Sequence, residues 1–224
     1  MRNVRSACSV LVLFSLGASA SAMVFNSTAV GLLGGAADSN WTVSGPSVTG
    51  TQQAITLNYA GNPFPYNAYA ANDAFSQWIS FAADGGNSLP AASTQGIYTY
   101  TTTVDFSGST GVLTGHVWSD NAIVDVLLGN VSLGVTPLAT TYAANSVDWF
   151  KKGSAFSLSG SGVQTVSFLI RNGFPGSGGP NDPTAFRARL SMQAVPEPFT
   201  MGLGLAAAGL FARRRLKSAA RLAV

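Results

Sequence analysis

Between residues 23 and 194 the chain repeats one pattern, in which apolar side chains take every second position of a short run. Stretches rich in Gly, Pro, Asn and Ser separate these runs, and YTYTTTVDF at residues 98–106 shows the pattern most plainly. Alternation with a period of two is typical of a β-strand that buries one face. The side chains that we expect to face inward are Tyr98, Tyr100, Val104, Phe106, Leu113, Gly115, Val117, Val124, Val126, Leu128, Val166, Phe168, Ile170, Phe186, Ala188, Leu190 and Met192.

Half-buried strands of this kind predict an all-β fold. Gly129-Asn130 separates two of the runs and predicts a two-residue hairpin turn. The runs show neither a convincing amphipathic helix nor an internal repeat, which disfavours a propeller or a solenoid. We therefore predict one antiparallel β-sandwich domain of jelly-roll type over residues 23–194, with Arg187 and Arg189 on its outer face.

The first 22 residues have a different composition from the domain that follows. Arg2 and Arg5 precede an apolar stretch at residues 10–16, and small residues up to Ala20 and Ala22 follow it. This order is typical of a secretory signal peptide, and the stretch is far shorter than the roughly 20 residues of a membrane-spanning helix. We expect signal peptidase to cleave after Ala20 or Ala22, which removes the only cysteine, Cys8, and leaves the mature protein without a disulfide.

The last 30 residues again depart from the β pattern. Val195, Pro196, Glu197 and Pro198 precede an uncharged apolar run at residues 199–212. As a helix this run would cover roughly 21 Å, against a hydrocarbon core of about 30 Å. It predicts a short apolar helix that is a weak permanent anchor. The basic cluster that follows consists of Arg213, Arg214, Arg215 and Lys217. We expect this cluster and the tail at residues 218–224 to stay in the cytoplasm.

The order Val-Pro-Glu-Pro, apolar run and arginine cluster over residues 195–217 resembles the PEP-CTERM sorting signal of Gram-negative bacteria. The resemblance implies an exosortase, a membrane cysteine transpeptidase, as the partner that cleaves near the Pro-Glu-Pro turn. It also implies a transient stay in the inner membrane, followed by export to the cell surface or to an extracellular polysaccharide matrix. Some classifications give the same tail the name of an ice-binding motif.

The domain itself resembles one that recurs ahead of such tails. The similar stretches run from YTYTTTVDFSG through LTGHVWSDNAIVDVLLGNVSLG and VQTVSFLIRNG to NDPTAFRARLSM. The resemblance implies a sandwich of the galactose-binding type, for which a carbohydrate is the suspected ligand. The chain departs from the usual pattern at Gly129-Asn130, where Asn-Gly is common.

Charge excludes nucleic acid as a partner, despite a sequence pI of about 9.2. Most of the basic residues flank the two terminal apolar runs. Between residues 23 and 194 there are five lysines and arginines against eight aspartates, which gives 5 − 8 = −3. A mildly acidic domain without a basic stripe lacks the electrostatic footprint of a nucleic-acid-binding protein.

The residues available for catalysis are few, and we expect no enzymatic activity. Over residues 23–194 the chain has a single histidine, His116, no cysteine and no glutamate. His116 is expected to point outward, away from Leu113 and Val117, and no nucleophile motif accompanies it. A hydrolase that depends on His116 is the weakest of the functions that the sequence leaves open.

A polar cluster at residues 118–121 is the candidate ligand site. Trp118, Asp120 and Asn121 lie where one strand is expected to end, and Asp182 or Asp38 would join them only if the fold brings them together. Their oxygen atoms suit Ca²⁺, and the indole suits a sugar ring. The alternative, which the sequence favours, is that Asp120-Asn121 forms an ordinary turn and that Trp118 packs in the core, with no cofactor.

Two irregular stretches complete the domain. Residues 172–184 are expected to form a Gly/Pro-rich loop that either carries binding residues or folds back onto the sheet, and residues 60–73 are expected to pack over the edge of the sandwich.

The leading hypothesis for function is a non-enzymatic protein of the cell surface or matrix, structural or adhesive. A carbohydrate-binding module is the alternative, with exopolysaccharide as a candidate partner, and ice binding through Thr99, Thr101 and Thr103 is less favoured.

Overall fold

The computed structural model describes residues 23–24, 26–58, 68–86, 95–173 and 183–194. Strands make up 56% of these residues, which confirms the all-β prediction. The four-residue α1 (Asp148–Lys151) is the one α-helix in the described ranges, and no helix there is long and apolar enough to cross a membrane. The predicted signal peptide and the C-terminal sorting segment lie outside the described residues.

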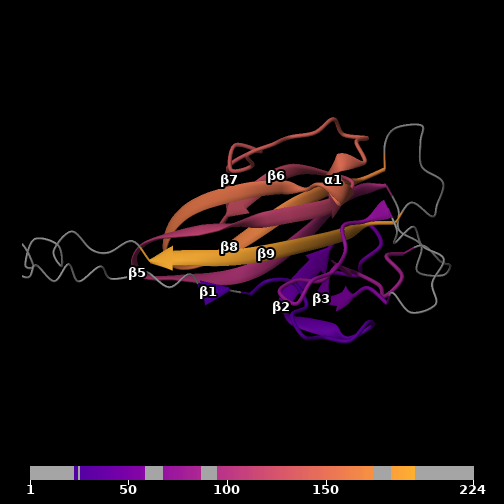
Figure 1. The fold of residues 1–224 in the computed structure, drawn as a ribbon, viewed down its shortest axis with the longest axis horizontal. Coiled ribbons are helices and arrows are strands. Elements are labelled where there is room, and N and C mark those ends of the chain that lie inside the picture. The colour runs from indigo at the N-terminus through magenta and orange to yellow at the C-terminus, as the bar shows by residue number, and fades with distance from the viewer. Residues whose placement is uncertain (1–22, 25, 59–67, 87–94, 174–182, 195–224) are drawn as a thin grey trace, which may run out of the picture.

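All strand pairings are antiparallel, and they run in the order β1-β9-β4-β3-β2-β5-β8-β6-β7. The long strands β5 and β8 pair with each other over almost their whole length (Figure 1). The bounds of the strands are β1 Met23–Val24, β2 Ala37–Ser44, β3 Thr51–Thr56, β4 Ile79–Ser80, β5 Gly96–Asp120, β6 Ala122–Leu128, β7 Val131–Ser132, β8 Ser154–Asn172 and β9 Ala185–Ala194.

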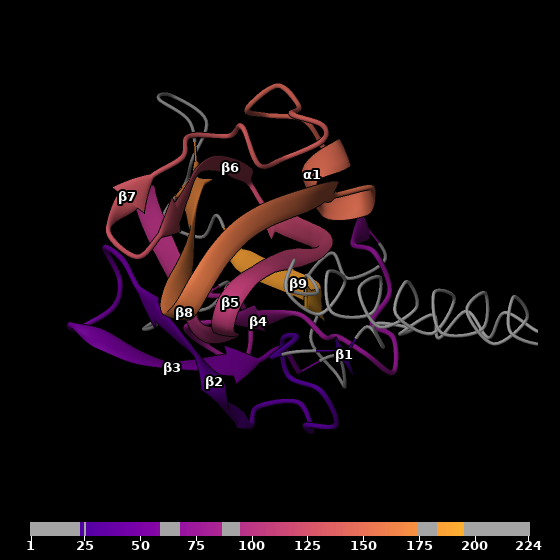
Figure 2. The same cartoon turned by 90° about the vertical axis from the view of Figure 1, so that its left-hand side faces the viewer.

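The sheet closes on itself because β5 has different neighbours along its length. Its first half pairs with β2 and its second half with β9, and β3 and β4 connect β2 back to β9. The result is a closed antiparallel barrel, which Figure 2 shows along its longest axis. The all-β, antiparallel part of the predicted fold is therefore confirmed, and the two-sheet jelly roll stays a prediction.

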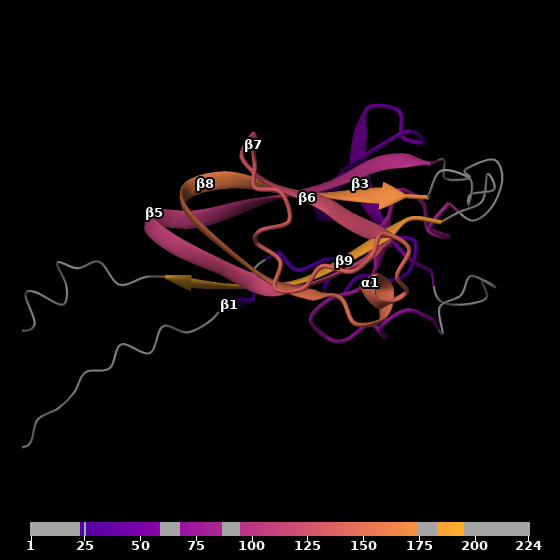
Figure 3. The same cartoon turned by 90° about the horizontal axis from the view of Figure 1, so that it is seen from above.

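The sequence predicted separate short strands where the structure has two long strands that curve over at one end of the barrel (Figure 3). In β5 the pairing shifts register between Asp105 and Thr110, and Gly162 in β8 has a φ of 63°. At the same place a Cβ on Gly160 would lie 2.8 Å from the ring of Phe106. Bulges and glycines bend strands without ending them, and the sequence does not distinguish such a bend from a turn.

The interior of the barrel is formed by the positions that alternation selected. Phe168 of β8 and Phe186 of β9 are fully buried with their ring centroids 5.0 Å apart, and both pack against Trp41 of β2. Of the other predicted inward residues, Gly115, Leu128 and Met192 are only partly buried. Those that are buried are Tyr98, Tyr100, Val104, Phe106, Leu113, Val117, Val126, Val166, Ile170, Ala188 and Leu190.

Val124 of β6, predicted to face inward, is only partly buried, although it packs against the core. The pairing of β6 with β8 shifts register between Ile123 and Asp125, so that Ile123 is buried and Val124 is half-buried. The extra residue of the bulge allows Ile123 and Val126 both to be buried, although they lie three positions apart. The Gly129-Asn130 hairpin is confirmed, because Leu128 pairs directly with Val131.

Both ends of the described domain lie at one end of the barrel. Met23 of β1 pairs with Met192 of β9, and Val24 pairs with Ser191. Because this pairing is antiparallel, the start of β1 lies beside the end of β9 (Figure 1). The two predicted processing segments are therefore joined to neighbouring points of the domain.

Candidate functional site

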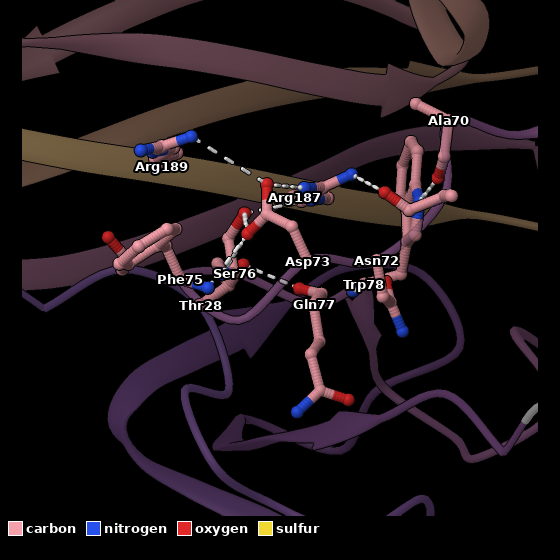
Figure 4. A network of polar contacts seen from close by, with 12 residues as sticks. Thr28, Ala70, Asn72, Asp73, Phe75, Ser76, Gln77, Trp78, Arg187 and Arg189 are labelled. Carbon is pink, nitrogen blue, oxygen red and sulfur yellow. Dashed lines mark hydrogen bonds and ion pairs between the residues drawn. The ribbon is translucent and has the colours of Figure 1, made fainter.

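A buried arginine lies at the centre of a polar network on the outside of the barrel. Alternation along β9 places Arg187 on the outer face, as predicted, yet only 2% of its surface is exposed. The segment of residues 68–78, which we call the cover, lies over it. Arg187 Nε donates to Ser76 Oγ at 2.9 Å, Nη1 donates to the carbonyl of Ala71, and Nη2 contacts Asp73 Oδ2 at 2.6 Å (Figure 4).

Asp73 connects the cover to the barrel. Its Oδ1 accepts hydrogen bonds from the backbone N–H groups of Phe75 and Ser76, both at 2.8 Å. Partial burial acts to raise the pKa of Asp73, but the Phe75 N–H and the positive charge of Arg187 outweigh it and hold this pKa below its ordinary value. Arg189 adds a longer contact of 3.9 Å to the same carboxylate. At neutral pH Asp73 is thus ionised and orders the turn at residues 73–76.

Further hydrogen bonds fix the shape of the cover. Trp78 Nε1 donates to the carbonyl of Ala70 at 2.8 Å, and Trp78 N–H donates to Asn72 Oδ1 at 3.0 Å. Thr28 Oγ1 donates to the carbonyl of Gln77 at 2.5 Å (Figure 4). Residues 60–73 were predicted to pack over the edge of the sandwich. Residues 70–73 contact Arg187 on the outer face of β9 and α1, and residues 60–67 lie outside the described part.

The structure places Trp118 beside this network rather than in an open rim site. The guanidinium carbon of Arg187 lies 4.3 Å from the centre of the indole, and the centre of the His116 ring lies 4.4 Å away. Trp118 and Arg187 are direct partners in the pairing of β5 with β9. Trp118 is half-buried on the outer face of the barrel. The alternative interpretation, that Trp118 packs in a core, holds in part, because the indole packs against a second buried apolar cluster of Leu57, Tyr69, Trp78 and Ala185 outside the barrel interior.

Asp120 and Asn121 are held by contacts within the protein. Asp120 is buried, and its two carboxylate oxygens accept hydrogen bonds from the Tyr69 hydroxyl and from Asn121 Nδ2. Asn121 Oδ1 accepts from Gly173 N–H at 3.0 Å. The described part of the chain contains no group of three or more His, Cys, Asp or Glu side chains able to hold a metal ion. Asp182 and residues 174–182 of the predicted loop lie outside the described residues.

His116 makes a structural contact. Its Nε2 lies 2.7 Å from the carbonyl oxygen of Lys152, and since a carbonyl only accepts, Nε2 carries the proton and donates. His116 faces outward from the barrel, as predicted, and is partly buried. The imidazole thus connects β5 to the residue that follows α1.

A cleft of about 400 Å³ opens where the cover meets the segment between β1 and β2. Phe75 of the cover lines it, together with apolar and polar side chains from residues 26–32 and 38–40. Asp38 also lines it and does not join the Trp118 cluster; its carboxylate accepts from Ala29 N–H at 2.6 Å and from Asn40 N–H at 2.9 Å. The sequence gives no signal for this cleft, because its walls come from three separate segments without shared periodicity.

Comparison with known proteins gives no match: no family model, no curated protein and no solved structure is similar to this chain.

Proposed function

We propose that this protein is a non-enzymatic exported protein, sorted by an exosortase to the cell surface or into an extracellular polysaccharide matrix. The observation that supports it most strongly is the order of the C-terminal segment, in which Val195-Pro196-Glu197-Pro198 precedes an apolar run and Arg213-Arg214-Arg215. Glu197 has no evident role in a simple membrane anchor. It has one in a recognition turn that an enzyme reads.

The geometry of the domain is compatible with such processing. The pairing of Met23 with Met192 brings the beginning and the end of the domain together at one end of the barrel. A domain whose two ends lie together can be tethered by either segment with its opposite end directed away from the membrane. Signal peptidase and the exosortase would then act on neighbouring points without unfolding the barrel.

The same proposal includes a finer description of the fold, as a jelly-roll sandwich of the galactose-binding type. The support is the doubling of β5 and β8. Tyr100 in the first half of β5 stacks on Phe186 at 5.2 Å, although Phe186 lies in β9, which pairs with the second half of β5. The two halves of the long strand thus lie on opposite sides of one aromatic core.

The sorting step is tested by Pro196→Ala and Glu197→Ala in the full chain, followed by cell fractionation and intact-mass measurement of the mature protein. We expect the wild type to lose the arginine cluster and to leave the inner membrane. Both variants should retain the tail and accumulate in the membrane. Thr200→Ala, in the adjacent apolar run, is the matched control and should be processed normally.

The sorting proposal fails if both variants have the mass and the location of the wild type. It also fails if the wild-type protein is found stably in the inner membrane with its arginines attached.

Carbohydrate binding is the second candidate function, and the cleft beside Phe75 is the observation that favours it. The sequence placed this activity at Trp118, but His116 and Arg187 already pack against that indole. Phe75 remains 45% exposed and lines the cleft.

A further inference from the structure

We propose that the cleft between the cover and residues 26–40 is a binding site for a neutral saccharide, with Phe75 as its stacking platform. The inference rests on the second candidate function and does not depend on sorting by an exosortase. The volume of about 400 Å³ lies in the lower part of the range of roughly 300–1,000 Å³ for small-molecule sites. A site of this size suits a short sugar unit.

Two contacts hold Phe75 in position. The guanidinium carbon of Arg189 lies 4.4 Å from the centre of its ring, and the Phe75 backbone N–H is fixed by the Asp73 carboxylate. An aromatic ring that is 45% exposed, yet restrained by a cation and by a turn, is ordered before any ligand arrives. Preorganisation of this kind lowers the entropic cost of binding.

The opposite wall is also preorganised, in an unusual backbone conformation. Asn26 and Ala29, with φ of 41° and 51°, are the non-glycine residues with positive φ in the described part of the chain. Asn26 is fixed by Trp41 Nε1, which donates to its carbonyl at 2.6 Å, and its own Nδ2 donates to the carbonyl of Thr103 at 2.8 Å. Such conformations persist where surrounding contacts determine them, and they are concentrated at ligand sites.

The chemistry of the lining selects a neutral, hydroxyl-rich ligand. Val30 and Leu32 supply apolar surface, while Ser39 and Asn40 are exposed, and their side chains make no hydrogen bond to any described residue. A few polar groups around an apolar surface is the usual composition of a small-molecule site. A sugar presents the matching surface, with one apolar face and hydroxyls at its edge.

The charges in the cleft argue against an anionic ligand. The one charged residue among its lining residues in the described part is Asp38, which is 2% exposed, and backbone N–H groups bind both of its oxygens. A sulfated or uronic acid sugar would meet this carboxylate, while Arg189 contacts the Phe75 ring but is not among the lining residues. Because Asp38 already has its partners, it supports the wall and does not provide a metal site.

The test is binding of the purified full chain, in detergent, to an array of neutral and acidic oligosaccharides, followed by titration calorimetry with the best neutral sugar. We expect Phe75→Ala to weaken binding at least about tenfold, because it removes the exposed aromatic surface that the sugar would cover. Phe75→Trp should restore it. Asn40→Ala leaves Phe75 and its support intact and should weaken binding by a smaller factor.

Val131→Ala, at an exposed position of β7 that is not part of the cleft, is the matched control and should bind as the wild type does. The proposal is overturned if no neutral sugar binds, if only acidic sugars bind, or if Trp118→Ala abolishes binding while Phe75→Ala and Asn40→Ala do not. The mass of the exported protein reports on sorting independently, so failure of one proposal leaves the other distinguishable.

Discussion

The barrel interior and the site of Arg187 on the outer face of β9 are both inaccessible to water, but they are built from opposite chemistry. Inside, Trp41, Phe168 and Phe186 form a fully buried aromatic cluster. Outside, the same strand β9 presents Arg187, which is equally buried but surrounded by hydrogen-bond acceptors of the cover. Adjacent positions of one strand thus bury a phenyl ring on one side and a guanidinium on the other.

The difference shows that the two faces depend on different terms in the folding free energy. The interior gains from removing apolar area from water, and this gain is non-directional and tolerant of small shifts. The covered face gains only if each buried donor has a partner, because an unpaired buried charge costs several kcal/mol. The interior can therefore be packed by many similar sequences, whereas the cover requires particular groups at particular places.

Truncating the interior should have the largest effect on stability. Phe168→Ala removes a ring that packs against Trp41, Phe156 and Phe186. We expect the free energy of unfolding to fall by about 3–5 kcal/mol, measured by urea denaturation. Val163→Ala on the same strand, where the side chain is 67% exposed, should change it by less than about 0.5 kcal/mol. Equal effects at the two positions would mean that the aromatic cluster is not the core.

This contrast also explains which buried faces of the fold could be predicted from the sequence. The inner faces of β5, β8 and β9 were predictable because burial on one side of a strand leaves a period of two in the sequence. The bulge between Ile123 and Asp125 was not predictable, because one extra residue shifts the alternation of buried and exposed positions without changing the composition. Arg187 was placed on the correct face but taken as exposed, since its partner Asp73 lies 114 positions away.

The candidate site was less predictable than the fold. Trp118, Asp120 and Asn121 attracted attention because polar residues cluster there in sequence, and the structure uses them for contacts with Arg187, Tyr69 and Gly173. The cleft beside Phe75 depends on the side-by-side arrangement of two loop segments and the start of β2. Loops leave no periodic signal, so the point where these segments meet is fixed by tertiary structure alone.

Removing the buried cation tests the covered face. We expect Arg187→Ala to lower the free energy of unfolding by about 3 kcal/mol. This value is near the lower end of the range for breaking a buried ion pair, because the Asp73 carboxylate that is left behind can still be hydrated. Arg189→Ala removes a 48% exposed partner of the same carboxylate and should cost less than about 1 kcal/mol. The two substituted positions lie two residues apart on the same face of β9, and urea denaturation curves compare the two variants directly. If both were equally mild, Arg187 would not hold the cover.

Asp73→Asn is expected to have a smaller effect than Phe168→Ala or Arg187→Ala, and it is the most specific of the three. The variant keeps the shape of the side chain but loses its charge beside Arg187, and we expect a loss of about 1–2 kcal/mol at pH 7, reduced by solvent at this partly exposed carboxylate.

The pH dependence identifies the cause of that loss. The folded pKa of Asp73 lies below its unfolded value of about 3.9, so its stabilising contribution is fully present above that value. It is lost as the pH falls through the lower, folded pKa, where the carboxylate becomes protonated in both states. The difference between wild type and variant should therefore be constant from about pH 5 to 7 and shrink below about pH 4. A difference that stays unchanged down to pH 2 would show that the amide disturbs packing, and that the charge of Asp73 does not stabilise the cover.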